Sequence, residues 1–184
     1  MNIQHVEIGI CGLSCRLCPM YHTHTESRCA GCKSHDRMVV GCPFISCAVK
    51  KRGVEFCWNC SESGICDKWK KHREAGREHD SFKCYQKLEN DISSILEHGI
   101  EEYEKQQRIR EQYLDKMLNE YNDGRSKSYY CIAATLLKIE ELRDVIDSAS
   151  KETKCMQLKQ KAKVLHLMLD SIASEKGYSL KLRK

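Results

Sequence analysis

Cysteine is the residue type in this sequence best able to do chemistry, and its spacing indicates metal binding. Eleven of the thirteen cysteines lie between residues 11 and 84. In a Cys-x-x-Cys pair a tight turn can bring both sulfurs onto one ion, and N–H groups of the turn stabilise the thiolates. Three such pairs occur: Cys15/Cys18, Cys29/Cys32 and Cys57/Cys60. The expected ligands are Cys11, Cys15, Cys18, Cys29, Cys32, Cys42, Cys47, Cys57, Cys60 and Cys66.

Metal binding is a better explanation of these cysteines than disulfide bonding. The first residues, Met1–Glu7, show neither the basic nor the apolar segment of a secretory signal. No apolar run approaches the length needed to span a membrane. We therefore expect a cytoplasmic protein that does not enter the membrane, and structural disulfides are rare in that compartment. The odd number of cysteines also argues against a fully paired disulfide framework.

Zinc is the expected metal, in two tetrahedral sites with four thiolates each. The simplest division places Cys15, Cys18, Cys29 and Cys32 on one ion, with Cys11 able to replace one of them. The second ion then takes four of Cys42, Cys47, Cys57, Cys60 and Cys66. An iron–sulfur cluster remains the alternative, because Cys11, Cys15 and Cys18 have a spacing that also holds clusters.

Two regions must position these ligands, and they differ in composition. Residues 1–85 contain few large aliphatic side chains, and a unit so poor in apolar residues usually needs metal or disulfide staples. Partial alternation over residues 5–10 predicts a short strand, and Pro43 to Arg52 predicts a short helix ending before Gly53. The expected fold class is a small irregular metal-stabilised α+β N-terminal module followed by an all-α helical region.

The region 86–184 shows helical periodicity and is expected to pack on the cysteine-rich module as one compact unit. Apolar stripes at helical spacing occupy residues 88–96, 109–121, 132–137, 139–149 and 158–172. These stripes are expected to be bundle core rather than a ligand site. Residues Tyr178, Leu180 and Leu182 alternate and predict a short edge strand. The outlying Cys84, Cys131 and Cys155 have no cysteine within reach of a hairpin and are expected to be free of metal.

The cysteine-rich half resembles the DUF3795 family, a domain of unknown function found in bacteria and archaea. The resemblance covers roughly residues 8 to 70 and departs from the family at Gly64-Ile65, before the last cysteine. It implies metal binding and no particular activity. Its motif is carried by Cys11, Gly12, Leu13, Cys15, Cys18, Pro19, Cys29, Gly31, Cys32, Cys42, Cys47, Ala48, Lys51, Gly53, Val54, Glu55, Phe56, Cys57, Cys60 and Cys66.

These observations predict a zinc-binding protein whose metal is structural and whose surface contacts an unidentified protein partner. We expect no catalysis from this chain alone, because no Gly-rich phosphate loop, His-Glu-x-x-His pair or nucleophile triad is recognisable, and we assign no catalytic residues. A zinc-ribbon nucleic-acid binder is a further alternative. Eight thiolates and two zinc ions would lower the formal charge from +5 to +1, which argues against nucleic acid as the partner.

Overall fold

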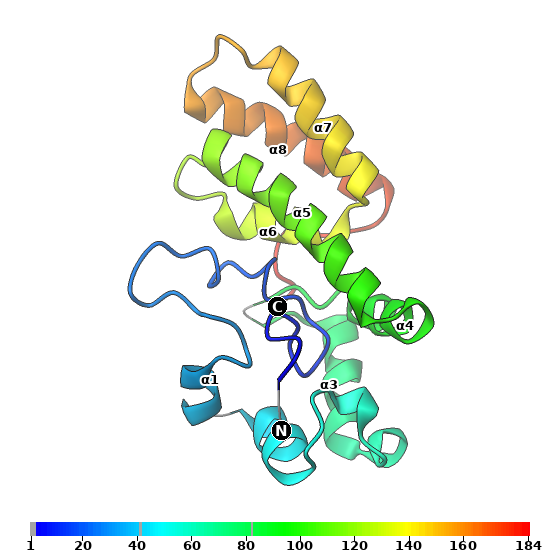
Figure 1. Cartoon of the computed structure of the whole chain (residues 1–184). Helices are drawn as coiled ribbons and strands as arrows, with labels where there is room; N and C mark the ends of the chain where they lie inside the picture. The colour runs from blue at the N-terminus through cyan, green and yellow to red at the C-terminus, as the bar shows by residue number, and fades with distance from the viewer. Residues whose placement is uncertain (1–2, 41, 82) are drawn as a thin grey trace.

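Helices dominate the structure, a computed structural model that describes residues 3–40, 42–81 and 83–184. The first half contains α1 (His35–Val40), α2 (Pro43–Ile45), a π-helical turn η1 (Ser46–Lys51) and the 3-10 turns η2 (Cys57–Asn59) and η3 (Ser63–Ile65). The helix α3 (Asp67–Glu78) ends this half, and the second half follows as α4 (Leu88–His98), α5 (Ile100–Glu120), α6 (Lys127–Leu136), α7 (Ile139–Glu152) and α8 (Leu158–Glu175). Figure 1 shows α5 to α8 gathered at one end and the loops of the cysteine-rich half at the other.

The predicted β content is wrong. Within the described residues there is no sheet, and the only β feature is an isolated bridge between Ile8 and Ser14. The segment 5–10 turns back on itself too soon to extend a strand, because Gly9 N–H bonds the Leu13 carbonyl at 2.8 Å and Gly12 N–H bonds the Gly9 carbonyl at 2.9 Å. The tail around Leu180 is irregular as well. The first half is therefore an irregular module of loops and short helical turns, not an α+β unit.

The predicted helices of the second half are all present. Gly99 separates α4 from α5 with a φ of 88°, a left-handed conformation that glycine adopts without strain. The turn before α6 is closed by the side chain of Asn122, whose Oδ1 accepts hydrogen bonds from the Gly124 and Ser126 amides at 3.1 and 3.3 Å. Among the described residues, no helix is both long and apolar enough to cross a membrane.

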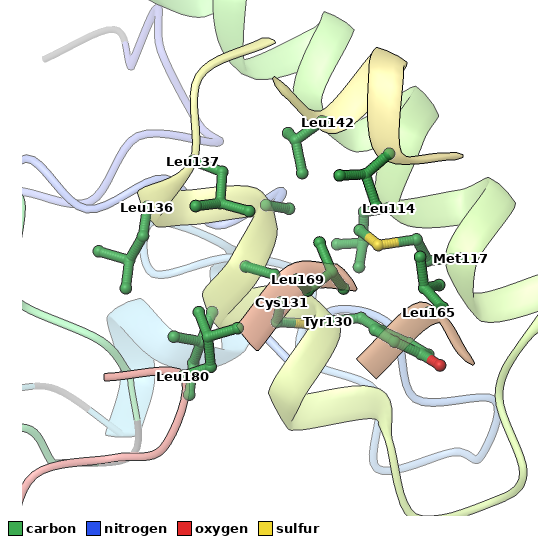
Figure 2. Close-up of a cluster of buried hydrophobic side chains, with 14 of the residues drawn as sticks. Leu114, Met117, Tyr130, Cys131, Leu136, Leu137, Leu142, Leu165, Leu169 and Leu180 are labelled. Carbon is green, nitrogen blue, oxygen red and sulfur yellow. The ribbon is translucent and has the colours of Figure 1, made fainter. Parts of the chain in front are cut away.

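The largest core lies among α5 to α8. Buried side chains from these four helices and from the C-terminal tail converge there, as Figure 2 shows. Its members include Leu114, Met117, Tyr130, Cys131, Leu136, Leu137, Leu142, Leu165, Leu169 and Leu180. Tyr130 satisfies its hydroxyl by donating to the Tyr121 carbonyl at 3.0 Å. The helical region thus contains an extensive apolar core of its own.

The cysteine-rich module packs against α4 and the start of α5. One seam joins Ile8 and Phe56 to Ile95 and Tyr103. A second seam joins Leu13 and Trp69 to Leu88 and Ile92. Both seams cover apolar surface that the module, with its small cores, could not bury alone.

The C-terminal tail returns to the module and is fastened there (Figure 1). Arg183 forms an ion pair with Asp80 at 3.0 Å, and the carboxylate of Asp80 is fully buried. The backbone pairs as well, because the Asp80 amide donates to the Arg183 carbonyl and the Arg183 amide donates to Oδ2 of Asp80, both at 2.9 Å. The chain end therefore contributes to holding α3 in place.

A buried carboxylate lies beneath the module. The Tyr103 hydroxyl lies 3.2 Å from Oδ2 of Asp91 and 3.3 Å from the Gly12 carbonyl. Burial raises the pKa of Asp91 to about 6, although the charges of Lys87 and Arg110 and the hydrogen bond from Tyr103 oppose the shift. The folded protein therefore binds a proton at Asp91 that the unfolded chain, with the ordinary value of 3.8, has released.

This shift predicts that stability falls as the pH rises from about 4 to about 6. Because the raised pKa favours the protonated carboxyl in the folded state, ionisation of Asp91 lowers the free energy of unfolding by about 1–3 kcal/mol. Asp91→Asn should flatten this dependence and stabilise the protein at pH 7, as measured by urea unfolding. The exposed Asp147→Asn on α7 is the control and should follow the wild type. A destabilised Asp91→Asn variant at pH 7 would contradict the prediction.

Candidate metal centres

Two cavities divide the ten predicted ligands between them. One, of about 30 Å³, is lined by Cys47, Cys57, Cys60 and Cys66, and we call it the four-cysteine cavity. The other, of about 360 Å³, is the six-cysteine cavity, lined by Cys11, Cys15, Cys18, Cys29, Cys32 and Cys42. Phe44 lines both cavities and so contributes to the wall between them. The two sets come from successive parts of the chain. The cysteines of the six-cysteine cavity lie between Cys11 and Cys42, and those of the four-cysteine cavity lie between Cys47 and Cys66.

Short helical turns position the members of the four-cysteine cavity. Cys47 lies on η1. Cys57 and Cys60 begin and follow η2, and the Cys60 amide donates to the Cys57 carbonyl at 3.3 Å, which closes the turn. Cys66 immediately precedes the first residue of α3. Trp69, one helical turn further on and 3% exposed, packs beside Cys57 and Cys66 and shields them from water.

The thiol of Cys57 is held in its neutral form by its surroundings. Burial raises the pKa of the Cys57 thiol to about 12, and the neighbouring thiolates of Cys11, Cys66, Cys47 and Cys60 raise it further. A bound cation would relieve this repulsion at Cys57. Arg52 and Lys68 also line this cavity and supply positive charge at its edge.

Two turns and a glycine position the six-cysteine cavity. Cys18 N–H donates to the Cys15 carbonyl at 3.0 Å, forming the first Cys-x-x-Cys turn. In the second pair, Gly31 has a φ of 108°, and a Cβ there would lie 3.2 Å from the Val6 carbonyl. Any side chain at residue 31 would therefore disturb the turn between Cys29 and Cys32.

Cys15 and Cys32 meet inside the six-cysteine cavity. The Cys32 amide donates to Sγ of Cys15 at 3.3 Å. Nζ of Lys83 lies 4.0 Å from Sγ of Cys15 and 3.9 Å from Sγ of Cys32. A hydrogen bond from the Cys15 thiol lowers the pKa of Cys32, and the charge of Lys83 lowers it further against the effect of burial. Burial disfavours the charged ammonium of Lys83, but the surrounding thiolates raise its pKa overall.

Three lining residues were not predicted from the sequence. Besides Lys83, the cavity is lined by Arg37, whose contact with Cys29 raises the pKa of the guanidinium, and by His72. The His72 ring lies 4.8 Å from Phe44 and 5.3 Å from Tyr85 between centroids, and burial lowers its pKa. Its Nε2 is buried with no hydrogen-bond partner among the described residues. The spacing of three between buried Trp69 and His72 is the sequence signal that could have placed this histidine on the inner face of α3.

The thiols line the cavities without forming a chelate as they lie. Within residues 3–40, 42–81 and 83–184, no three Cys, His, Asp or Glu side chains are close enough together to hold one ion. In a tetrahedral zinc site, sulfur atoms lie about 3.8 Å apart, as follows from a Zn–S bond of about 2.3 Å. All thirteen cysteines are free thiols, so none of the ten is committed to a disulfide.

The three outlying cysteines line neither cavity. Cys84 and Cys131 are buried in the main core, where a thiol behaves as a small hydrophobic group, and burial raises the pKa of Cys84 to about 11. Cys155 is exposed in the connection between α7 and α8. Their separation from the ten lining cysteines leaves Cys155 available as a control position for metal-binding experiments.

Comparison with protein families gives one match. The model of DUF3795, described as a protein of unknown function, matches residues 7–71. These residues contain both cavities' cysteines from Cys11 to Cys66 and end within α3. Neither the curated proteins nor the solved structures include a match to the chain. The predicted resemblance is confirmed: residues 7–71 match the model of the DUF3795 family, whose function is unknown.

Proposed function

We propose that this is a zinc-binding protein in which Cys47, Cys57, Cys60 and Cys66 hold one structural Zn²⁺ and the six-cysteine cavity supplies a second metal site. The observation that carries the proposal is the convergence of four cysteines, from three separate turns, on one cavity of about 30 Å³. Four thiolates are the most common type of structural zinc ligand set. Small inward movements of the thiol side chains, driven by deprotonation and binding, would complete the site.

The surroundings of the four-cysteine cavity favour a structural role over catalysis. Four thiolates fill the tetrahedral coordination of zinc and leave no position for substrate or activated water. Trp69 and Phe44 line the cavity and limit access of water. Arg52 and Lys68 would partly balance the net negative charge that four thiolates and one Zn²⁺ carry. We therefore infer an accessory role in which the folded module presents its outer surface to a protein partner rather than to nucleic acid.

Metal analysis of matched variants tests the proposal. We expect the purified full-length protein to contain at least one zinc per chain, and the double variant Cys57→Ser/Cys60→Ser to lose about one. Cys155→Ser, at an exposed cysteine outside both cavities, should keep the wild-type content. Thiol modification of the native protein should release zinc in proportion to the thiolates blocked, which provides a readout that does not depend on the folding of a variant. Unchanged zinc in Cys57→Ser/Cys60→Ser would contradict the assignment.

A further inference from the structure

The two cavities differ too much in size to hold the same metal group. The six-cysteine cavity has a volume of about 360 Å³ and the four-cysteine cavity about 30 Å³. A single tetrahedral zinc ion uses four ligands within a sphere of about 2.3 Å radius. The larger cavity offers six thiols and far more space than one such ion occupies. A polynuclear group, bridged by its own inorganic atoms, fits that space better.

The groups around this cavity are those that stabilise bound sulfur. The Cys32 amide already points at sulfur, with its nitrogen 3.3 Å from Sγ of Cys15. Nζ of Lys83 is within 4.0 Å of two thiols. Gly31, with a φ of 108°, directly precedes Cys32 in this loop. Hydrogen bonds to sulfur are a recurring feature of iron–sulfur centres.

The positive charges and the unpartnered histidine nitrogen around the six-cysteine cavity also favour an iron–sulfur cluster there. An iron–sulfur cluster with four thiolate ligands carries net negative charge, and Lys83 and Arg37 both line the cavity to offset it. His72 adds a buried Nε2 that has no hydrogen-bond partner within the described part of the chain. A cluster sulfide or a cluster-bound ligand would provide an acceptor for this nitrogen. Among the described residues that line the four-cysteine cavity, no buried side-chain nitrogen or oxygen lacks a hydrogen-bond partner.

We propose that the six-cysteine cavity binds an iron–sulfur cluster through Cys15, Cys18, Cys29 and Cys32, with Lys83 as the cation that adjusts its reduction potential. These four residues form the two Cys-x-x-Cys turns of the cavity, and Cys32 and Cys15 are already in contact. Cys42 is exposed at the edge of the cavity. The inference deepens the proposed thiolate–metal function, and the zinc assignment of the four-cysteine cavity is independent of it.

Anaerobic purification from iron-replete cells separates the two assignments. We expect the full-length protein to contain iron and acid-labile sulfide in equal amounts, with visible absorption, together with about one zinc per chain. Cys15→Ser/Cys18→Ser should lose iron and sulfide and keep zinc, whereas Cys57→Ser/Cys60→Ser should lose zinc. A protein with zinc alone, before and after reconstitution with Fe²⁺ and sulfide, overturns the cluster. Iron that survives in Cys15→Ser/Cys18→Ser also overturns it, and iron without zinc overturns only the zinc assignment.

A Lys83 variant tests the cluster without removing a ligand. One-electron reduction by dithionite adds a negative charge to the cluster, and a nearby ammonium stabilises that charge. Lys83→Met should therefore keep its iron and sulfide and shift the midpoint potential to a more negative value. Lys159→Met, at an exposed position on α8, should leave the potential unchanged. Equal potentials for Lys83→Met and wild type would show that the cluster, if present, does not lie beside Lys83.

Discussion

Removal of the metals is expected to unfold the cysteine-rich module while α5 to α8 remain folded. Thiolate–zinc binding contributes roughly 10–16 kcal/mol in small zinc-finger peptides, which exceeds the stability of most small domains. Residues 42–66 contain only short turns, and their local core consists of Ile10, Ile45 and Ala48 with partly buried neighbours. Without metal, this segment has too little buried apolar surface to offset the entropy of ordering its backbone.

The helical end should survive chelation because its stability has a separate source. Its core joins side chains from α5, α6, α7 and α8, and includes Leu114, Leu142, Leu165 and Leu169, all fully buried. None of the ten lining cysteines is among these core residues except Cys18's neighbours in sequence, and the core itself contains only Cys84 and Cys131. Unfolding of the module would expose the face of α4 that packs against it, which carries Leu88, Ile92 and Ile95. We therefore expect a modest decrease in the cooperativity of the remaining unfolding transition.

The two tryptophans provide the measurement. Trp58 and Trp69 are the only tryptophans in the sequence, and both lie in the cysteine-rich half. Chelation should red-shift their fluorescence and abolish the stacking of Phe56 on Trp58, whose centroids lie 4.4 Å apart. Far-UV circular dichroism should retain most of its helical signal, and returning Zn²⁺ under reducing conditions should restore the fluorescence. Unchanged fluorescence after verified metal removal would show that the module does not depend on metal for folding.

Sequence reasoning located the helices more reliably than the irregular module. The stripes at 88–96 and 158–172 predict α4 and α8 because a period near 3.6 has few alternative explanations. The alternation in residues 5–10 misled, because it arises from a tight loop in which Ile8 and Ile10 enter two different small cores. Alternation over six residues cannot distinguish a strand from such a loop, since only long-range contacts decide between them.

In the candidate site too, sequence reasoning finds the features that depend on local sequence and misses those that depend on long-range contacts. The ten lining cysteines are recognisable from spacing, which is local information along the chain. Lys83 and His72 are not, because they reach the six-cysteine cavity only through the packing of α3 and the segment after it. The difference in volume between the cavities is likewise a tertiary property, and our proposal of a one-ion site in one cavity and a cluster in the other rests on it.

Arg110→Met is expected to destabilise the metal-loaded protein by about 3–5 kcal/mol. Arg110 is only 7% exposed, and its Nη1 donates to the carbonyl of Ala134 at 2.8 Å and to that of Leu137. Ala134 lies in the last turn of α6 and Leu137 caps its C-terminus, where backbone acceptors have no partner within the helix. The guanidinium therefore satisfies buried acceptors and places a positive charge at the negative end of the helix dipole.

Methionine retains much of the volume of arginine but leaves both carbonyls buried without a donor, at about 1–3 kcal/mol for each unsatisfied group. It also removes a positive charge that acts on Asp91. Arg108→Met on the same helix is the matched control, because Arg108 is 56% exposed and its ion pair with Glu104 is a surface contact. Urea unfolding followed by circular dichroism should show a change below about 0.5 kcal/mol for this control. Equal stability of the two variants would mean that water or another donor replaces Arg110 at the end of α6, and that the buried guanidinium does not hold α5 and α6 together.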